Sequence, residues 1–393
     1  MFHGTPLIMV EDADALDEMV RTLEKAPVIG IDTESDSSYS YQEKVCLIQL
    51  SNMDTDWIVD PLKVDDMSAL GPLLSNPDVV KVLHGADYDL VCLKRDFGFT
   101  FRNLYDTLIA AQLLSMERIG LADVIERYFG NELDKQYQRH NWALRPLRPE
   151  HLDYARGDTH WMCAVHELTS RKLRQIGRMR HMKEECELLE KREWAQREPK
   201  VNPWLDMKGI NKLDDEAKRV LRHLSDYRDT QGKRMNRPVY KVIPNQVLLQ
   251  LAVERPESMS DLDRLFRGKQ AMKRRHGKAL IDAVLDGLED DRPIPKPQKK
   301  QAPKRKGPRS RLQGRAADKA FAALKEWRQR TLSANRALTP YMTASNGVLK
   351  AIASRRPYDL DELAEIPDVR EWQVEDWGDD LLDVLDKVDP LDD

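Results

Sequence analysis

The sequence predicts a mixed α/β domain followed by two small all-helical domains. Three observations support this fold class: apolar runs alternate with amphipathic stretches up to about residue 170, strand patterns nearly vanish after it, and a later segment occurs twice. Strands that interleave with helices at this spacing predict a mixed sheet covered by helices. A chain of 393 residues is also too long for one compact core, so two or three domains are expected.

The elements of the first domain follow from the spacing of its apolar residues. The stretch "PVIGIDTE" is apolar at both alternating positions, which is typical of a strand covered on both faces. The segment after residue 165 is long, charged and periodic, and it predicts one helix that leads out of a domain spanning 1–190. Strands are expected at residues 27–34, 44–52, 56–61 and 79–86, and helices at 14–26, 69–76, 87–98 and 166–194.

Two stretches of the C-terminal half match each other. Tyr227 and Arg228 correspond to Trp327 and Arg328 at an offset of 100 residues. After one inserted residue the offset becomes 101, with matches of Tyr240, Asn245, Leu248, Ala252, Pro256, Leu262 and Gly277 to Tyr341, Asn346, Leu349, Ala353, Pro357, Leu363 and Gly378. Because polar and Gly positions keep register with the apolar ones, a tandem duplication is indicated. We expect a connector at residues 191–210 and helical domains at 211–290 and 316–388.

Charge is distributed unevenly along a chain whose net charge is −4. Residues 292–315 hold ten Lys or Arg, five Pro and no acid, which predicts an extended linker bounded near 291–315. This linker is either a solubilising spacer or a tether that contacts phosphates. From residue 358 onward the chain has fifteen Asp or Glu and only two basic residues, Arg370 and Lys387. This end is therefore not expected to bind phosphates by itself.

Several classes of protein are disfavoured by composition. No run of about 18 apolar residues occurs, and the N-terminal stretch turns acidic too early for a secretory signal, so we expect a cytoplasmic protein without a membrane partner. The spacing of the cysteines favours reduced structural residues over a zinc site or a disulfide framework. No coiled-coil heptad stands out, and a monomer is expected. The cysteines are Cys46, Cys92, Cys163 and Cys186.

Asp32 and Glu34 lie at the end of the first buried strand. Alternate side chains of a strand share a face, so the two acids are expected about 6–7 Å apart on one side, where they repel each other unless a cation lies between them. Surface strands often carry such a pair, but burial of the preceding residues points to the sheet edge where α/β folds bind ligands. Asp36 has the same parity but enters a Ser-rich turn, so we leave it outside the site.

Two helical stretches supply further candidates. Asp87 and Asp89 fall in a first helical turn, where acids commonly cap the helix or complement its dipole. That role suits Asp87, whereas Asp89 precedes an apolar face and could be held over the end of the sheet. Tyr154 and Asp158 are four residues apart and therefore share one helix face. A plain hydrogen bond between these two on a surface helix is the alternative.

Four acids and a Tyr in one crevice suit a pair of hard divalent cations. Mg²⁺ or Mn²⁺ prefers carboxylate oxygen, and the sequence offers no His or Cys cluster for a softer metal. Two such ions activate a water and stabilise the departing oxygen of a phosphodiester. Phosphodiester hydrolysis is therefore the predicted chemistry.

Three motifs resemble those of a known superfamily. "GIDTES", "HGADYDLVCL" and "YARGDTHWM" are similar, in order and separation, to the signature motifs of the DEDD 3′→5′ exonucleases, in the branch with Tyr four residues before the last Asp. "YDTLIAAQLL" and "NWALRPL" resemble stretches shared by the ribonuclease D family and the exosome exonuclease. The helical repeats resemble HRDC domains. The resemblance covers nearly the full length and implies a ribonuclease H-like sheet flanked by helices.

The resemblance also implies roles for individual residues. Tyr154 becomes the residue that positions the attacking water, and Asp87 drops out of the site. The implied reaction removes nucleotides one at a time from an RNA 3′ end and releases nucleoside 5′-monophosphates, with tRNA precursors as substrates. Because the reference pKa of Tyr is near 10, we expect its hydroxyl to orient the water rather than to act as a base. The implied metal ligands are Asp32, Glu34, Asp89 and Asp158.

The accessory regions offer weaker candidates for substrate contact. Residues 264–278 give the first repeat a basic edge, whereas the matching part of the second repeat is acidic. We expect the first repeat and the linker to contact RNA, and the second repeat to pack against protein. Trp142 and Arg145 are candidates for substrate contact, although a Trp in this stretch is explained equally well as a core residue.

Two other functions remain open from sequence. A DNA-directed 3′→5′ exonuclease would use the same metal chemistry, since the 2′-hydroxyl alone distinguishes RNA. A non-catalytic RNA-binding scaffold would be expected to have lost active-site residues, but all five are present. The sequence names neither the natural RNA nor the metal, Mg²⁺ or Mn²⁺.

Overall fold

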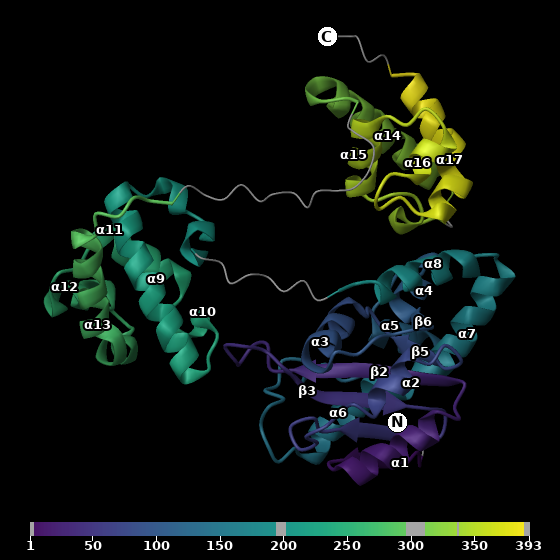
Figure 1. Ribbon diagram of the computed structural model, residues 1–393, viewed down its shortest axis with the longest axis horizontal. Helices are drawn as coiled ribbons and strands as arrows, with labels where there is room; N and C mark the ends of the chain where they lie inside the picture. Colours follow the sequence, from purple (N-terminus) through teal and green to yellow (C-terminus); the bar gives the residue numbers. More distant parts are fainter. Residues whose placement is uncertain (1–3, 194–201, 296–310, 336–337, 389–393) are drawn as a thin grey trace. The chain divides into compact units, whose positions relative to one another are not determined.

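The computed structural model describes residues 4–193, 202–295, 311–335 and 338–388 (Figure 1). The chain divides into two compact units. One contains the α/β domain and the second helical repeat, and the other contains residues 35–44 together with the first helical repeat. Most of the predicted linker 291–315 and part of the connector 191–210 lie outside the described residues, and the predicted domain boundaries stay predictions. No helix in the described part of the chain is long and apolar enough to cross a membrane.

The α/β domain is built on a mixed sheet, as predicted, but the sheet has six strands where the sequence predicted four. Its strand order is β1-β4-β3-β2-β5-β6, in which β3 and β4 pair antiparallel while β1 with β4, β2 with β5, and β5 with β6 pair parallel. The edge strands β1 and β6 are not anticipated from the sequence. The strands are β1 (Leu7–Val10), β2 (Val28–Ser35), β3 (Val45–Ser51), β4 (Asp56–Val59), β5 (Val80–Leu83) and β6 (Leu104–Asp106).

Eight helices accompany this sheet in the described part of the α/β domain. The prediction of one helix over 166–194 is wrong, because Gly177 interrupts it with a left-handed φ of 71°. Glycine adopts this conformation without the steric cost that other residues incur, so the first helix ends and the second begins in a new direction. The helices are α1 (Ala13–Leu23), α2 (Leu70–Ser75), α3 (Asp87–Phe97), α4 (Thr107–Leu113), α5 (Leu121–Phe129), α6 (Pro149–His160), α7 (Met162–Gln175) and α8 (Met179–Glu190).

Helix α6 is attached to the sheet by a buried polar cluster. Arg156 on α6 donates from Nε to Oδ2 of Asp56 at 2.9 Å, and His160 Nδ1 lies 2.9 Å from the same oxygen. Burial alone would raise the pKa of Asp56, but hydrogen bonds from His160, Ser51 and Arg156 hold it below its ordinary value. A buried acid held in this way needs its cationic partner, so α6 is fixed against β4.

Gly30 on β2 permits the junction of α6 and α7 to approach the sheet closely. A Cβ atom at this position would lie 2.9 Å from the carbonyl oxygen of Thr159 and 2.9 Å from Cβ of Met162. Contacts this short do not occur in folded proteins, so a larger residue would push the helices away from β2.

The two helical repeats share elements and hydrogen bonds. Arg228 Nη1 donates to the carbonyl of Ile243 at 3.1 Å, and the matching Arg328 Nη1 donates to that of Ala344 at 2.7 Å. The equivalent helices are α9 (Asp215–Met235) and α14 (Gly314–Ala334), α11 (Asn245–Glu254) and α15 (Asn346–Arg355), α12 (Met259–Leu265) and α16 (Leu360–Ala364), and α13 (Gln270–Glu289) and α17 (Glu371–Asp386). Shorter elements are α10 (Val239–Val242), η1 (Pro203–Asp206), η2 (Ile210–Lys212) and η3 (Pro340–Met342).

The repeated glycines have one structural explanation. A Cβ at Gly277 would lie 3.2 Å from the Met259 side chain, and one at Gly378 would overlap the side chain of Leu360. Met259 and Leu360 are themselves 101 residues apart, so each domain packs its first short-helix residue against the glycine of its last helix. The duplication predicted from the sequence is thus visible in side-chain packing.

Candidate active site

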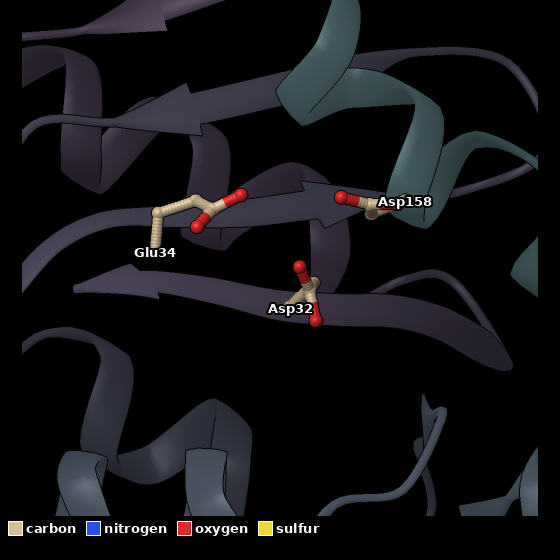
Figure 2. A group of neighbouring side chains, drawn as sticks. All are labelled: Asp32, Glu34 and Asp158. Carbon is tan, nitrogen blue, oxygen red and sulfur yellow. The ribbon is translucent and has the colours of Figure 1, made fainter. Parts of the chain in front are cut away.

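Three carboxylates converge where β2 passes beneath α6. Figure 2 shows Asp32 and Glu34 on β2 and Asp158 on α6, with their side chains directed into one space. One carboxylate oxygen from each residue lies within 4.8 Å of the others. The flanking Ile29 and Ile31 are fully buried, so the strand is held rigidly while its acids stay partly accessible to solvent.

Asp89 stands beside this group and Asp87 does not belong to it. Asp89 lies in the first turn of α3, is 9% exposed, and accepts a short hydrogen bond from the hydroxyl of Thr33, the residue between Asp32 and Glu34. Asp87 instead forms an ion pair with Arg192 at 2.6 Å. Asp89 therefore lies next to the group of Asp32, Glu34 and Asp158 without being one of its three members, and its role as a fourth metal ligand stays a prediction.

The turn that presents Asp89 depends on Asp106, a residue that the sequence patterns do not single out. The backbone N–H groups of Gly85 and Ala86 each donate to the Asp106 carboxylate at 2.9 Å, and the N–H of Leu108 donates to it at 2.8 Å. Asp106 thus caps α4 and shapes the chain entering α3. Its motif, "YDTLIAAQLL", is the one signal in the sequence, but nothing in the motif names its hydrogen-bond partners.

The pKa values of the four acids indicate that a nearby positive charge would stabilise their ionised forms. Burial first, and then the neighbouring carboxylates, hold the pKa values of Asp32 and Glu34 well above their ordinary range. Burial raises the pKa of Asp89 to about 6, and burial together with Asp89 raises the pKa of Asp158 to about 7. All four donors are carboxylates, a set that suits a hard divalent cation. The residues present therefore fit a divalent metal centre.

Tyr154 lies one helical turn before Asp158 and is enclosed by aromatic rings. Its ring centre is 5.7 Å from that of Trp142, tilted by 31°, and 6.1 Å from that of Tyr137, which stands nearly perpendicular. Burial, followed by the charges of Asp158, Glu34 and Asp32, raises the pKa of Tyr154 far above its ordinary value. The hydroxyl therefore keeps its proton at neutral pH, which fits an orienting role rather than that of a base.

Trp142 and Arg145 lie in a support layer behind Tyr154. Trp142 is 1% exposed, which agrees with the core alternative left open by the sequence. Arg145 grips both carboxylate oxygens of Asp60, with Nε–Oδ2 at 2.6 Å and Nη2–Oδ1 at 2.7 Å, and donates to the carbonyls of Trp142 and Cys46. These contacts favour a structural role for both residues over direct substrate contact.

Asp36 is confirmed as a turn residue. It is buried and accepts hydrogen bonds from the Ser40 hydroxyl and, at 2.8 Å, from the backbone N–H of Lys44. Its side chain thus closes the loop that follows β2, and it lies outside the acidic group of Asp32, Glu34 and Asp158.

The fold and the acidic site define a class of protein that comparison with known families identifies. Residues 7–174 match the family model described as "3'-5' exonuclease", and residues 217–284 and 317–385 each match the HRDC domain. Residues 7–174 thus form a domain of the 3′-5′ exonuclease family, and two HRDC domains follow it in the chain. Exonucleases of this family depend on divalent metal ions, in agreement with the acidic group.

Individual relatives refine this assignment. The chain is 28% identical to ribonuclease D of Desulfotalea psychrophila over 71% of this chain and 75% of that protein. The crystal structure of Escherichia coli RNase D, described as an exoribonuclease involved in structured RNA processing, matches with a TM-score of 0.64 and 25% identity over 97% of this chain and 98% of that one.

The eukaryotic relatives are longer proteins. The exosome complex exonuclease RRP6 of Saccharomyces cerevisiae is 29% identical over 73% of this chain but only 42% of its own length. The chain spans less than half the length of this protein, of the RRP6-like proteins of Arabidopsis thaliana, and of the exosome complex component 10 homologues of Drosophila melanogaster and Caenorhabditis elegans. Similarity to these proteins therefore concerns only part of their length.

The raised pKa of Asp158 predicts how stability depends on pH. Between its ordinary pKa of 3.8 and its raised value of about 7, the folded metal-free protein binds more protons than the unfolded chain. Stability contributed by this group is therefore complete below pH 4 and is lost as the pH rises through about 7. Asp158→Asn is expected to raise the melting temperature at pH 8 in EDTA, by roughly 2–4 °C for each kcal/mol of repulsion relieved.

The control for this prediction is Asp153→Asn, because Asp153 lies on the same helix with its side chain exposed. Thermal denaturation of both variants and the wild type at pH 5 and pH 8 provides the measurement. The rise in melting temperature caused by Asp158→Asn should be smaller at pH 5, where the wild-type carboxyl is largely protonated. A gain of equal size at both pH values, or an unchanged melting temperature at pH 8, would contradict the electrostatic account.

Proposed function

We propose that this protein is a metal-dependent 3′-5′ exoribonuclease that trims RNA 3′ ends and releases nucleoside 5′-monophosphates. The observation that carries the proposal is the convergence of Asp32, Glu34 and Asp158 beside Tyr154, within a domain of the 3′-5′ exonuclease family. The raised pKa values of Asp32 and Glu34 support the proposal, because bound cations would neutralise the repulsion between these acids.

In the proposed mechanism the acids act as ligands and the Tyr as an orienting group. Asp32, Glu34, Asp89 and Asp158 would hold two divalent ions, Mg²⁺ or Mn²⁺. When bound, these ions would supply Lewis-acid activation of a water and stabilisation of the departing 3′ oxygen. The protonated hydroxyl of Tyr154 would hydrogen-bond that water and aim it at the terminal phosphate, while the rings around Tyr154 restrict its motion.

The proposed substrates are RNAs with a free 3′ end, including tRNA precursors. The match to ribonuclease D over most of both chains supports RNA over DNA, and the DNA-directed exonuclease is kept as the second candidate. A non-catalytic scaffold is disfavoured because the site residues are gathered in one place. We further propose that the protein acts in the cytoplasm as a monomer.

We propose that the two helical domains bind different partners, RNA at the first repeat and protein at the second. In the first repeat, exposed Arg274 and Arg275 line a cleft of about 760 Å³ with Lys269 and Gln270, which suits phosphate contacts. At the matching positions of the second repeat stand Glu375 and Asp376.

The acids of the second repeat contact helix α8. Arg180 forms ion pairs with both Glu375 and Asp376, and His181 Nε2 lies 2.7 Å from an oxygen of Asp376. Trp372 on α17 is 2% exposed and donates from its indole nitrogen to Glu185 at 3.2 Å. These contacts support the hypothesis that the second repeat packs against protein while the first contacts RNA.

Substitutions at the site test the catalytic proposal. Asp32→Asn should lower 3′ trimming by at least about a hundredfold, because one metal ligand is lost while the shape of the side chain is kept. Tyr154→Phe should lower kcat markedly with metal affinity retained, because only the orienting hydroxyl is removed. The measurement is digestion of a tRNA carrying extra 3′ nucleotides, with product analysis, and an equal-length DNA strand in competition.

The matched control is Asp36→Asn, at an acid of the same strand parity outside the group. It should keep trimming near the wild-type rate once its folding is verified. Normal trimming by Asp32→Asn, or activity that persists after chelation of divalent ions, would exclude the proposal. Equal digestion of DNA and RNA would favour the second candidate.

The division between the repeats predicts a difference in salt dependence. Replacing Arg274 and Arg275 by Ala should weaken RNA binding, and the slope of log affinity against log salt should fall by about 1 for each phosphate that is no longer neutralised. Replacing Glu375 and Asp376 by Ala should leave RNA affinity near its original value. Deletion of residues 316–393 extends the test: a large, salt-sensitive loss of RNA affinity would refute the hypothesis for the second repeat.

A further inference from the structure

A second cleft opens at the end of β2 remote from the acidic site. Its volume is about 810 Å³, within the range of about 300–1,000 Å³ usual for small-molecule sites. It is walled by α7, by the chain between α1 and β2, and by the turn between β3 and β4. Neither the acidic site nor the helical repeats account for it.

The cleft is separate from the candidate active site. Val28, the first residue of β2, lines it, whereas Asp32 lies four residues further along, about 13 Å at the usual rise of a strand. None of the four acids or Tyr154 is among its lining residues. A molecule seated here would not occupy the space between Asp32, Glu34 and Asp158.

The charges around the cleft leave room for an anion. Its charged lining residues are three cations, Lys25, Arg171 and Arg174, and two acids, Asp54 and Glu167. Arg171 donates to Glu167 at 2.6 Å and is thereby neutralised, but Arg174 Nη2 donates to the uncharged hydroxyl of Ser170 at 3.0 Å. Within the described residues no carboxylate forms an ion pair with Arg174 or Lys25. A guanidinium in this state suits a phosphate, which it can bind through two parallel hydrogen bonds.

The remaining lining suits a flat, largely apolar group. Pro27, Val28 and Met53 contribute apolar surface, and Met53 is 63% exposed on the turn between β3 and β4. A flexible, polarizable Met side chain adapts readily to an aromatic ring. His166 packs its imidazole edge-on to Tyr105 with ring centres 4.5 Å apart, and its pKa is lowered to about 4 by burial and by Arg174, so it remains neutral.

We propose that this cleft is a binding site for a nucleoside monophosphate, with the phosphate at Arg174 and Lys25 and the base against Met53 and His166. The choice of ligand rests on the proposed function, because nucleoside 5′-monophosphates are the products of that reaction. Binding here and substrate binding at the acidic site take place on different surfaces. The same phosphate-and-base chemistry could come from a free nucleotide or from the 5′ end of an RNA, and the test distinguishes the two.

The test is isothermal titration of the full chain with AMP in EDTA, so that the acidic site lacks its ions. We expect a Kd of about 0.1–1 mM, which corresponds to roughly −5.5 to −4 kcal/mol. Adenosine and inorganic phosphate, which each offer half of the recognition, should bind at least about tenfold more weakly. Arg174→Gln should weaken AMP binding by about tenfold or more, whereas Arg21→Gln, an exposed cation on α1 outside the lining, should not.

The outcomes separate this inference from the proposed function. Absence of AMP binding at about 5 mM, an affinity unchanged in Arg174→Gln, or binding seen only when divalent ions are restored would overturn it. Tighter binding of a 5′-phosphorylated RNA, lost in the same variant, would assign the cleft to RNA instead of free nucleotide and would also overturn it. Failure to trim RNA would refute the proposed function but leave the titration result standing.

Discussion

The mutual repulsion of acids gathered beside β2 is the constraint on which the rest of the structure depends. Two unit charges 4 Å apart repel by roughly 4 kcal/mol at an effective dielectric constant of 20. One carboxylate oxygen each of Asp32, Glu34 and Asp158 lies within 4.8 Å of the others, and burial adds to the cost of charging Asp32. A fold that keeps such groups together must hold their elements by other interactions, and it leaves a site that favours cations.

Helix α6 shows how that cost is offset. One side of it carries Asp158 toward β2, and another is tied to β4 through Arg156 and Asp56. Arg145, in the loop before α6, is hydrogen-bonded to Asp60. Trp142 in the same loop packs against the ring of Tyr154. These attachments hold the elements that carry the acids, so the acidic group is set before any ion binds. Preorganisation of this kind is what positions a reactive water without further rearrangement.

Side-chain positions that follow from the alternation of a strand or the spacing of a helix can be predicted from the sequence. Contacts between residues far apart in the chain cannot. The shared face of Asp32 and Glu34 follows from strand alternation, and the pairing of Tyr154 with Asp158 follows from helical spacing. The grip of Arg145 on Asp60 joins residues 85 positions apart, and no periodicity reports it. The break at Gly177 was missed because one glycine within a charged, periodic run does not by itself end a helix. The helical duplication was predictable because its polar and glycine positions keep register.

The most direct test of the central claim is a count of divalent ions bound by the full chain. Titration with Mn²⁺ at pH 8, followed by the loss of the free-ion electron paramagnetic resonance signal, should show two ions per chain. At pH 5.5, where Asp89 and Asp158 are largely protonated in the metal-free protein, affinity should fall steeply. Absence of Mn²⁺ binding at pH 8, or binding that is independent of pH between these values, would contradict the account.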